Sequence, residues 1–158
     1  MEADERPMRL AIAEARKNLR TVSGGPFGAC IVKGSRILAC ERNTLLRRND
    51  ATCHAEINAI RRASKKLASY DLSGCEIYAT TEPCPMCFGA IHWARIDRII
   101  YGTSIPDVRR LGFNELMIPA GKMKAEGKSK VRIEGGFLLD ECKSLLKDWL
   151  KLKKRKVY

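Results

Sequence analysis

Two short segments of the sequence carry residue types that could bind a metal ion. Cys84 and Cys87 are separated by two residues, and His54 precedes them in the chain. Two thiolates and one imidazole are typical zinc ligands, and three protein ligands leave the fourth tetrahedral position open for water. Glu56 lies two residues after the histidine, where its carboxylate could move a proton of that water. The sequence therefore predicts a catalytic Zn²⁺ site, with His54, Cys84 and Cys87 as metal ligands and Glu56 as the catalytic residue.

The elements around these residues predict how they converge. A helical pattern of apolar residues runs over 53–69, so His54 and Glu56 can address one site only if they sit at its first turn. A strand over 75–80 leads to Pro85, which suits the first position of a helix. Cys84 and Cys87 then lie at a helix N-terminus, where the partial positive charge favours the thiolate that a metal requires.

The rest of the chain alternates between helical and strand patterns. A strand, a helix and a strand follow one another over 75–101, which indicates a parallel pair with a right-handed crossover. Residues 44–50 read as a loop, and 104–130 as an irregular segment that carries short helices or part of the binding site. We also expect a helix over 4–19, a hairpin of strands over 27–32 and 37–40, a short strand over 131–133, and a helix over 137–152.

Composition and cysteine usage are those of an ordinary globular protein. The 158 residues are 45% hydrophobic and 30% charged, which predicts one domain over 1–158. No apolar run reaches the length of a membrane span, and the polar segment 1–7 is no signal peptide, so we expect no membrane partner and a cytoplasmic location. Seven cysteines form no even framework, and they are expected to be reduced. Four of them lie in apolar patterns and are expected in the core: Cys30, Cys40, Cys75 and Cys142.

The net charge of +12 leaves two interpretations open. Such a surface attracts polyanions, and a nucleic acid such as tRNA is one possible partner. The simpler interpretation is a soluble surface rich in Lys and Arg, and charge alone does not decide between them.

Other interpretations of the same residues also stay open. A Cys-Pro-x-Cys at a helix N-terminus is typical of thioredoxin-like redox motifs, although it leaves His54 and Glu56 unexplained. A structural zinc site would result if Glu56 or Cys53 closed the fourth position. Cys53 otherwise suits a packed small residue, and His92 suits a packed or solvent-bonded histidine.

The segments His54-Ala55-Glu56 and Pro83-Cys84-Pro85-Met86-Cys87 together resemble the zinc-dependent cytidine and nucleobase deaminase superfamily. The resemblance covers nearly the whole chain. It implies an α/β fold of three layers, α/β/α, around a mixed five-stranded sheet. It also implies hydrolytic deamination, in which Zn²⁺ lowers the pKa of water to about 7 and Glu56 transfers protons to the ring and to the leaving amine.

Within that superfamily, Gly24-Gly25-Pro26-Phe27-Gly28-Ala29, Trp93-Ala94-Arg95 and Gly112-Phe113 resemble the bacterial guanine deaminases. That resemblance implies a free purine base as substrate, guanine first, converted to xanthine and ammonia. Asn43 would hydrogen-bond the base, and Phe27 and Trp93 would form the aromatic walls that stack on it.

The same resemblance assigns substrate contacts to the C-terminal part of the chain. The family often has an acidic pair after Gly-Phe that reads the guanine edge. Here the pair is Asn114-Glu115, so guanine requires Glu115 to take that role, since an amide cannot accept two N–H donors as a carboxylate does. A homodimer is implied, and the basic helix and tail over 137–158 can be exchanged between subunits. Tyr158 would then cover the neighbour's pocket, although a frayed tail is the plainer interpretation.

Three alternatives to guanine remain. The tRNA adenosine deaminases share Glu-Pro-Cys and Ala94-Arg95-Ile96, and the basic charge favours them, but Thr103-Ser104-Ile105 and the Gly-Phe insertion differ from the short turn expected there. Cytosine or another small amidine base is a second alternative. A basic RNA-binding module with a vestigial zinc site is the third, although binding alone would not require Glu56.

Overall fold

A mixed five-stranded sheet organises the protein in a computed structural model that describes residues 2–158. The strand order is β2-β1-β3-β4-β5. β1 runs antiparallel to both of its neighbours, whereas β3, β4 and β5 run parallel. This confirms the α/β fold with a mixed five-stranded sheet, including the hairpin and the parallel pair that the sequence predicts. The strands are β1 (Gly28–Lys33), β2 (Arg36–Arg42), β3 (Cys75–Thr81), β4 (Arg98–Thr103) and β5 (Arg132–Glu134).

Helices begin and end close to the predicted positions, and one segment is more helical than expected. Residues 45–48 form a short helix where a loop is predicted, and Asn49, in a left-handed conformation, ends it. The irregular segment carries two short helices, as expected. The helices are α1 (Glu5–Arg16) with the 3-10 turn Lys17–Leu19, α2 (Leu45–Arg48), α3 (Ala55–Leu67), α4 (Pro85–Trp93), α5 (Ile105–Arg109), α6 (Ala120–Glu126) and α7 (Leu139–Leu150).

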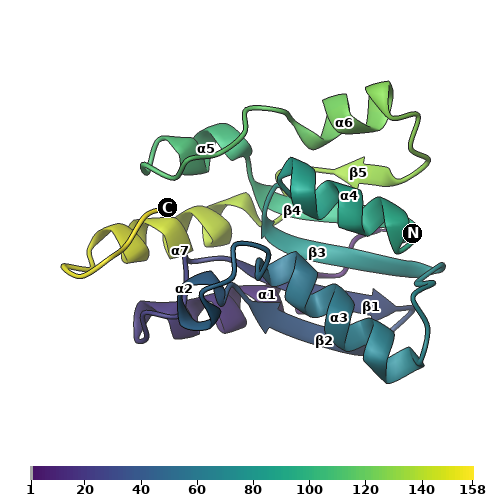
Figure 1. Cartoon of the computed structure of the whole chain (residues 1–158), viewed down its shortest axis with the longest axis horizontal. Coiled ribbons are helices and arrows are strands. Elements are labelled where there is room, and N and C mark those ends of the chain that lie inside the picture. Colours follow the sequence, from purple (N-terminus) through teal and green to yellow (C-terminus); the bar gives the residue numbers. More distant parts are fainter. Residues whose placement is uncertain (1) are drawn as a thin grey trace.

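Helices cover both faces of the sheet and complete the three layers (Figure 1). Alternate residues of each strand point to opposite faces. Ile31 and Ile77 therefore pack against α3 and α4 in one core, and their neighbours Val32 and Tyr78 pack against α1 in another. A smaller third core joins α5 to α7 through residues such as Val108 and Trp149. The predicted extent of the domain, 1–158, stays a prediction, and Met1 lies outside the described residues.

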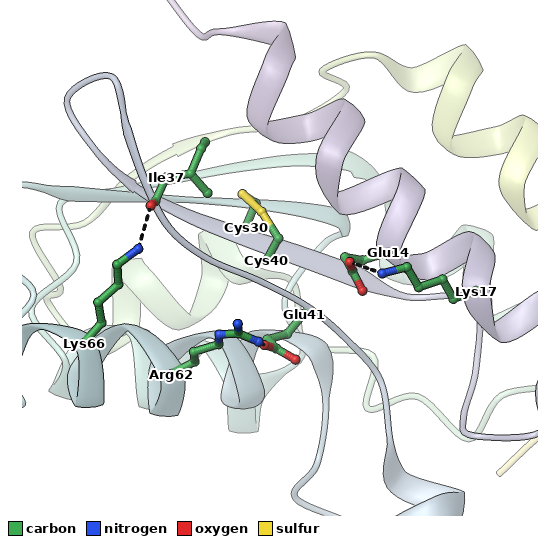
Figure 2. Close-up of a disulfide and its surroundings, with 8 residues drawn as sticks. All are labelled: Glu14, Lys17, Cys30, Ile37, Cys40, Glu41, Arg62 and Lys66. Carbon is green, nitrogen blue, oxygen red and sulfur yellow. Dashed lines mark hydrogen bonds and ion pairs between the residues drawn. A yellow bond between two sulfur atoms is a disulfide. The ribbon is translucent and has the colours of Figure 1, made fainter.

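The expectation of reduced thiols is wrong for two cysteines. Cys30 of β1 and Cys40 of β2 are direct partners across the hairpin, with Cα atoms 4.1 Å apart, and their sulfur atoms form a disulfide (Figure 2). Their apolar contexts correctly placed both near the core, but only the register of the hairpin brings them opposite one another. Cys53, Cys75 and Cys142 are buried free thiols, as expected.

No helix described in residues 2–158 combines the length and the hydrophobicity that crossing a lipid bilayer requires. The cytoplasmic location itself stays a prediction.

Candidate active site

Three predicted metal ligands converge at the N-termini of two adjacent helices. His54 is the N-cap of α3, and Cys84 is the N-cap of α4. His54 Nδ1 lies 3.7 Å from the Sγ of Cys84 and 3.6 Å from the Sγ of Cys87. In residues 2–158, the ligand atoms of these three side chains lie within 4.8 Å of one another, close enough to hold one metal ion. Neither Glu56 nor Cys53 belongs to the group, so its composition is that of a catalytic zinc site with an open position.

The spacing of the ligand atoms fits zinc. Typical Zn–S and Zn–N bonds in a tetrahedral arrangement place the nitrogen and each sulfur about 3.6 Å apart, and the observed separations are 3.6 and 3.7 Å. The donor set of two thiols and one imidazole also favours Zn²⁺ over the oxygen-binding cations. His54, Cys84 and Cys87 can therefore hold the zinc ion that the sequence predicts.

Local backbone geometry explains why these residues share one point. Both N-cap residues have extended backbone conformations, and Pro85 occupies the first position of α4. Cys87 and Glu56 then lie in the first turns of α4 and α3, so their side chains face the same junction. The prediction that His54 and Glu56 meet only at a helix start is confirmed.

The ionisable groups at this junction have strongly shifted pKa values. A hydrogen bond from Cys87, together with the His54 imidazole, lowers the pKa of Cys84 to about 4. The hydrogen bond to Cys84 and burial raise the pKa of Cys87 well above its ordinary value. Burial raises the pKa of Glu56 to about 7. A carboxyl with a pKa near neutrality can both accept and donate a proton at physiological pH, as a proton shuttle must.

A narrow cavity adjoins the ligand group and has a free volume of about 30 Å³. That is enough for water but far below the roughly 300–1,000 Å³ of most small-molecule sites. A base can enter only if part of the lining moves. The lining consists of Phe27, Gly28, Asn43, His54, Glu56, Thr80, Thr81, Glu82, Cys84, Glu115 and Tyr158.

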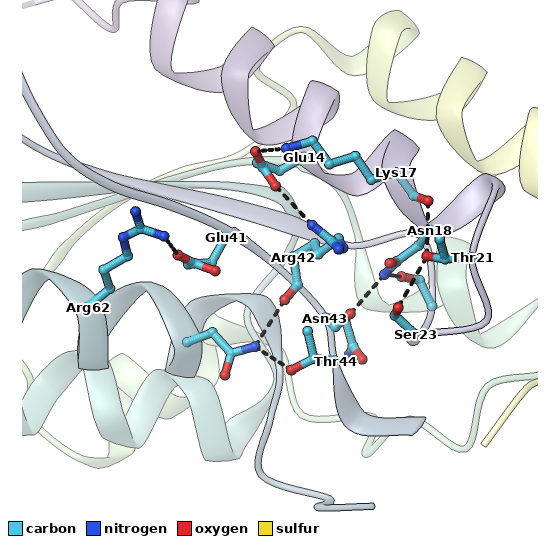
Figure 3. Close-up of polar contacts among 12 residues, drawn as sticks. Glu14, Lys17, Asn18, Thr21, Ser23, Glu41, Arg42, Asn43, Thr44 and Arg62 are labelled. Atoms are coloured by element: carbon cyan, nitrogen blue, oxygen red, sulfur yellow. Dashed lines mark hydrogen bonds and ion pairs between the residues drawn. The ribbon is translucent and has the colours of Figure 1, made fainter. Parts of the chain in front are cut away.

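Asn43 reaches the cavity as expected, and a polar network fixes it in place. Its Oδ1 accepts a hydrogen bond from the backbone N–H of Leu45 at 3.0 Å. Its carbonyl accepts one from the side-chain amide of Asn18 at 2.8 Å (Figure 3). Asn18 also donates to the carbonyl of Gly25 at 2.8 Å. Gly24 leaves room for the Asn43 side chain, because a Cβ at position 24 would lie only 2.2 Å from the Asn43 Oδ1.

The predicted pair Asn114-Glu115 separates in the structure. Glu115 is half-buried and lines the cavity, whereas the side chain of Asn114 is exposed. Burial raises the pKa of the Glu115 carboxyl, and the nearby charge of Cys84 adds to the shift. Arg109 holds this turn by donating to the Glu115 carbonyl at 2.8 Å. Of the two residues, Glu115 can contact a molecule beside the metal ligands, and Asn114 cannot in this conformation.

Tyr158 closes the cavity of its own chain. The Tyr158 hydroxyl accepts a hydrogen bond from the Gly25 backbone N–H at 2.9 Å, and the Tyr158 carbonyl oxygen accepts one from the Asn114 backbone N–H at 2.9 Å. The Tyr158 ring contacts Phe113, which in turn contacts Phe27 and Trp149, with ring centroids 5.1–5.2 Å apart. Tyr158 is thus an ordered part of the pocket, and the interpretation as a frayed tail is wrong. Exchange of the tail between subunits stays a prediction.

A family model described as the cytidine and deoxycytidylate deaminase zinc-binding region matches residues 1–103 of the chain. The chain belongs to this deaminase family.

The relatives of this deaminase act on different amines. The chain is 42% identical to a guanine deaminase of Bacillus subtilis (strain 168) over a match of 111 residues. The match covers 70% of this chain and 71% of the relative. It is 33% identical to a tRNA-specific adenosine deaminase of Buchnera aphidicola subsp. Schizaphis graminum (strain Sg) over a match of 129 residues. The match covers 82% of this chain and 82% of that relative. A solved guanine deaminase from Nitrosomonas europaea matches 96% of this chain and 87% of its own at 28% identity, with a TM-score of 0.86. The protein is a zinc-dependent hydrolytic deaminase.

One of the two predicted aromatic walls does not line the cavity of its own chain. Phe27 lines the cavity, but Trp93 does not, and 79% of its surface is exposed at the end of α4. The metal ligands lie at the other end of this helix. A helix of nine residues is about 13 Å long, so Trp93 cannot stack on a base held at the metal ligands of its own chain.

Glu82 is a site residue that the sequence did not indicate. It is 6% exposed and lines the cavity of the deaminase. One carboxylate oxygen accepts the backbone N–H of Ile105 at 3.1 Å, and the other accepts that of Ala120 at 2.8 Å. These two residues begin α5 and α6. Glu82 thereby fixes both ends of the segment that carries Glu115, and the only sequence signal is its place directly before Pro83 and Cys84.

Proposed function

We propose that the protein hydrolyses the amino group of a free purine base, with guanine as the preferred substrate and xanthine and ammonia as products. The observation that carries this proposal is the Glu115 carboxylate in the cavity beside the catalytic group. A carboxylate only accepts hydrogen bonds. Guanine has a ring N–H next to the carbon that loses its amine, whereas adenine and cytosine have an unprotonated ring nitrogen there. The Glu115 carboxylate can therefore accept a hydrogen bond from the ring N–H of guanine, whereas it would repel the unprotonated ring nitrogen of adenine or cytosine.

The chain's own residues can perform the proton transfers of this reaction. A zinc ion held by His54, Cys84 and Cys87 would supply Lewis-acid activation, which makes water reactive at neutral pH. Glu56, with a pKa of about 7, would take a proton from the attacking water and deliver it to the ring nitrogen. It would then help to protonate the amine that leaves as ammonia. Asn43 would orient the base, and Phe27 would contact one of its faces.

Substrate entry requires the C-terminal tail to move. The free volume of about 30 Å³ cannot hold a purine while Tyr158 occupies the cavity. Two hydrogen bonds and one aromatic contact hold Tyr158 there, and such a contact set can open and close on each turnover. The tail would therefore open to admit the base and close over it, which excludes water during the reaction.

The experiment that tests the proposal is ammonia release from a panel of guanine, adenine, cytosine, their nucleosides and a tRNA anticodon stem. We expect release from guanine at least tenfold faster than from any other member, and Glu115→Gln should reduce that preference. Release from the tRNA stem alone would contradict the free-base assignment.

The second candidate function is deamination of adenosine in tRNA. The net charge of +12 and the tRNA-specific relative favour it. A titration with salt separates the two candidates, because binding of a polyanion weakens steeply as salt rises whereas binding of a neutral base does not. We expect the Michaelis constant for guanine to change less than twofold between about 50 and 200 mM salt.

A homodimer, with or without exchanged tails, is part of the same proposal. Sedimentation analysis should give twice the mass of one chain. In mixtures of Glu56→Gln chains with chains truncated before Tyr158, recovery of activity would show that a tail serves the neighbouring subunit. A monomer that is fully active would remove the dimer from the proposal.

A further inference from the structure

A second cavity of about 410 Å³ lies between the C-terminal tail and the loop that follows α1. Its apolar wall consists of the side chains of Leu19, Val22, Leu46, Trp149 and Leu152. Five cationic side chains also line the cavity: Arg20, Lys153, Lys154, Arg155 and Lys156. This set of five is called the basic rim below.

The basic rim differs from the other cationic surfaces of the protein, because no carboxylate belongs to its cavity. A cavity beside α3 is also basic, but Glu41 lines it and pairs with Arg62 at 2.6 Å. A third cationic cavity includes Asp97. Within residues 2–158, no member of the basic rim has an ion pair with a carboxylate. Five positive charges around one concave site repel one another, and a multiply charged anion would relieve that repulsion.

The inner lining also includes one buried polar residue. Asn18 is 3% exposed, and its side-chain nitrogen is fully used by the carbonyls of Gly25 and Asn43. Its Oδ1 is buried and has no hydrogen-bond partner among the described residues. Asn18 also lines this second cavity.

We propose that this second cavity binds a nucleoside di- or triphosphate, with the phosphates on the basic rim and the base against the apolar wall. The volume lies within the usual range for small-molecule sites, roughly 300–1,000 Å³. Arginine and lysine side chains are the usual partners of phosphate oxygens. The proposal concerns a site separate from the catalytic cavity, and it does not depend on the identity of the base that is deaminated.

A ligand in this position would act on the catalytic cavity through the tail. Lys156 lies two residues before Tyr158, and Arg20 belongs to the loop that leads to Gly25. The Gly25 N–H is the group that holds the Tyr158 hydroxyl. A polyphosphate that bridges Arg20 and the tail lysines would therefore hold Tyr158 in its closed position. The nucleotide should then raise the KM for the base, and by linkage the base should weaken nucleotide binding by the same factor.

Calorimetric titration tests the binding site directly, with GTP, inorganic pyrophosphate, guanosine and a short single-stranded RNA as probes. We expect GTP to bind with a stoichiometry of one per chain, pyrophosphate to bind more weakly, and guanosine not to bind. The variant K153A/K154A should weaken GTP binding by about tenfold or more, since it removes two charge-assisted contacts. The matched control is K143A/K147A, which removes the same charge from exposed positions of α7 and should change the affinity less than twofold.

Each other outcome overturns the proposal. Absence of GTP and pyrophosphate binding would remove the site, as would GTP binding that both double variants leave unchanged. Binding of the RNA alone, lost in K153A/K154A, would assign the basic rim to nucleic acid instead. Metal content measured after each titration ensures that the phosphates have not extracted zinc.

Steady-state kinetics test the link to the tail. GTP at saturation should raise the KM for the base severalfold and leave kcat unchanged, and K153A/K154A should abolish that effect. A KM that GTP does not change, in a protein that binds GTP, would overturn the coupling to Tyr158.

Discussion

The two halves of the catalytic cavity are built in different ways. The half that holds the metal ligands comes from the first turns of α3 and α4, and each ligand is placed by a helix start. The other half, which the proposed function assigns to the base and which is called the base-facing half below, comes from Phe27, Asn43, the segment between α5 and α6, and Tyr158. Glu82 from the end of β3, together with Arg109 and Phe113, holds the segment between α5 and α6 and Tyr158 in place.

Because of this difference, the metal half can determine the reaction while the other half determines which substrate is used. A helix start is a local structure, and a short motif is enough to encode it. A loop held by a few long-range contacts can change its sequence, and with it the substrate, while the metal half stays intact. A family whose relatives deaminate guanine or tRNA adenosine is consistent with that division. Substitutions in the metal half should therefore abolish the reaction, and substitutions in the other half should change its substrate.

The largest effect is expected from Glu56→Gln in the metal half. The amide cannot shuttle protons, and general acid–base catalysis typically contributes about 10²–10⁴-fold to a rate. We expect kcat to fall by at least that factor while zinc content, measured by atomic absorption, stays at one per chain. Cys87→Ser is the matched comparison, since it should lose zinc and activity together. Turnover close to that of the wild type in Glu56→Gln would remove this residue from the mechanism.

The next largest effect is expected from Glu115→Gln in the base-facing half. The substitution replaces a charged acceptor by an amide, and hydrogen bonds to charged groups contribute about 1.5–3 kcal/mol. We expect kcat/KM for guanine to fall by roughly 10–100-fold, with zinc content unchanged. Asn114→Ala is the comparison, and because that side chain is exposed it should reduce kcat/KM much less. Equal losses in the two variants would show that the turn is rearranged when substrate binds.

A smaller effect is expected from Glu82→Gln, which acts on Glu115 through the backbone. The amide can accept from only one of the two N–H groups and places an NH₂ against the other. We expect a loss of about 1–3 kcal/mol in the free energy of unfolding and a rise of roughly tenfold in KM for guanine, with zinc retained. Glu126→Gln removes the same charge from an exposed position and serves as the control. A loss of zinc in Glu82→Gln would instead place this residue in support of the metal ligands.

The sequence predicted the metal half almost completely and the base-facing half only in part. His54, Glu56, Cys84 and Cys87 follow from residue chemistry and from the periodicity of two helices, because the spacing along the chain determines the spacing in space. Glu82 was missed because its hydrogen-bond partners are backbone groups 23 and 38 residues away. The Cys30–Cys40 disulfide was missed for a similar reason, since the hairpin register decides which residues are opposite.

The strands and long helices were predictable from their apolar periodicity, and their boundaries shifted by only a few residues. The choice between Asn114 and Glu115 depended on how one turn is oriented. Arg109 and the contact between the Asn114 backbone and Tyr158 fix that orientation. Such contacts leave no periodic trace in a sequence.

The smallest effect is expected from Trp93→Ala, and it tests the one aromatic wall that the structure does not support. Trp93 is 79% exposed and is separated from the metal ligands by the length of α4. An exposed side chain of this kind usually changes the free energy of unfolding by about 0.5 kcal/mol or less. We expect the KM for guanine to change less than twofold in steady-state kinetics. A tenfold rise in this KM would mean that Trp93 contributes to a catalytic cavity. Because Trp93 lies too far from the cavity of its own chain, that cavity would belong to a neighbouring subunit. Measuring the same KM as a function of protein concentration, across the range where a dimer dissociates, would then separate a contribution from a neighbour from a change within one chain.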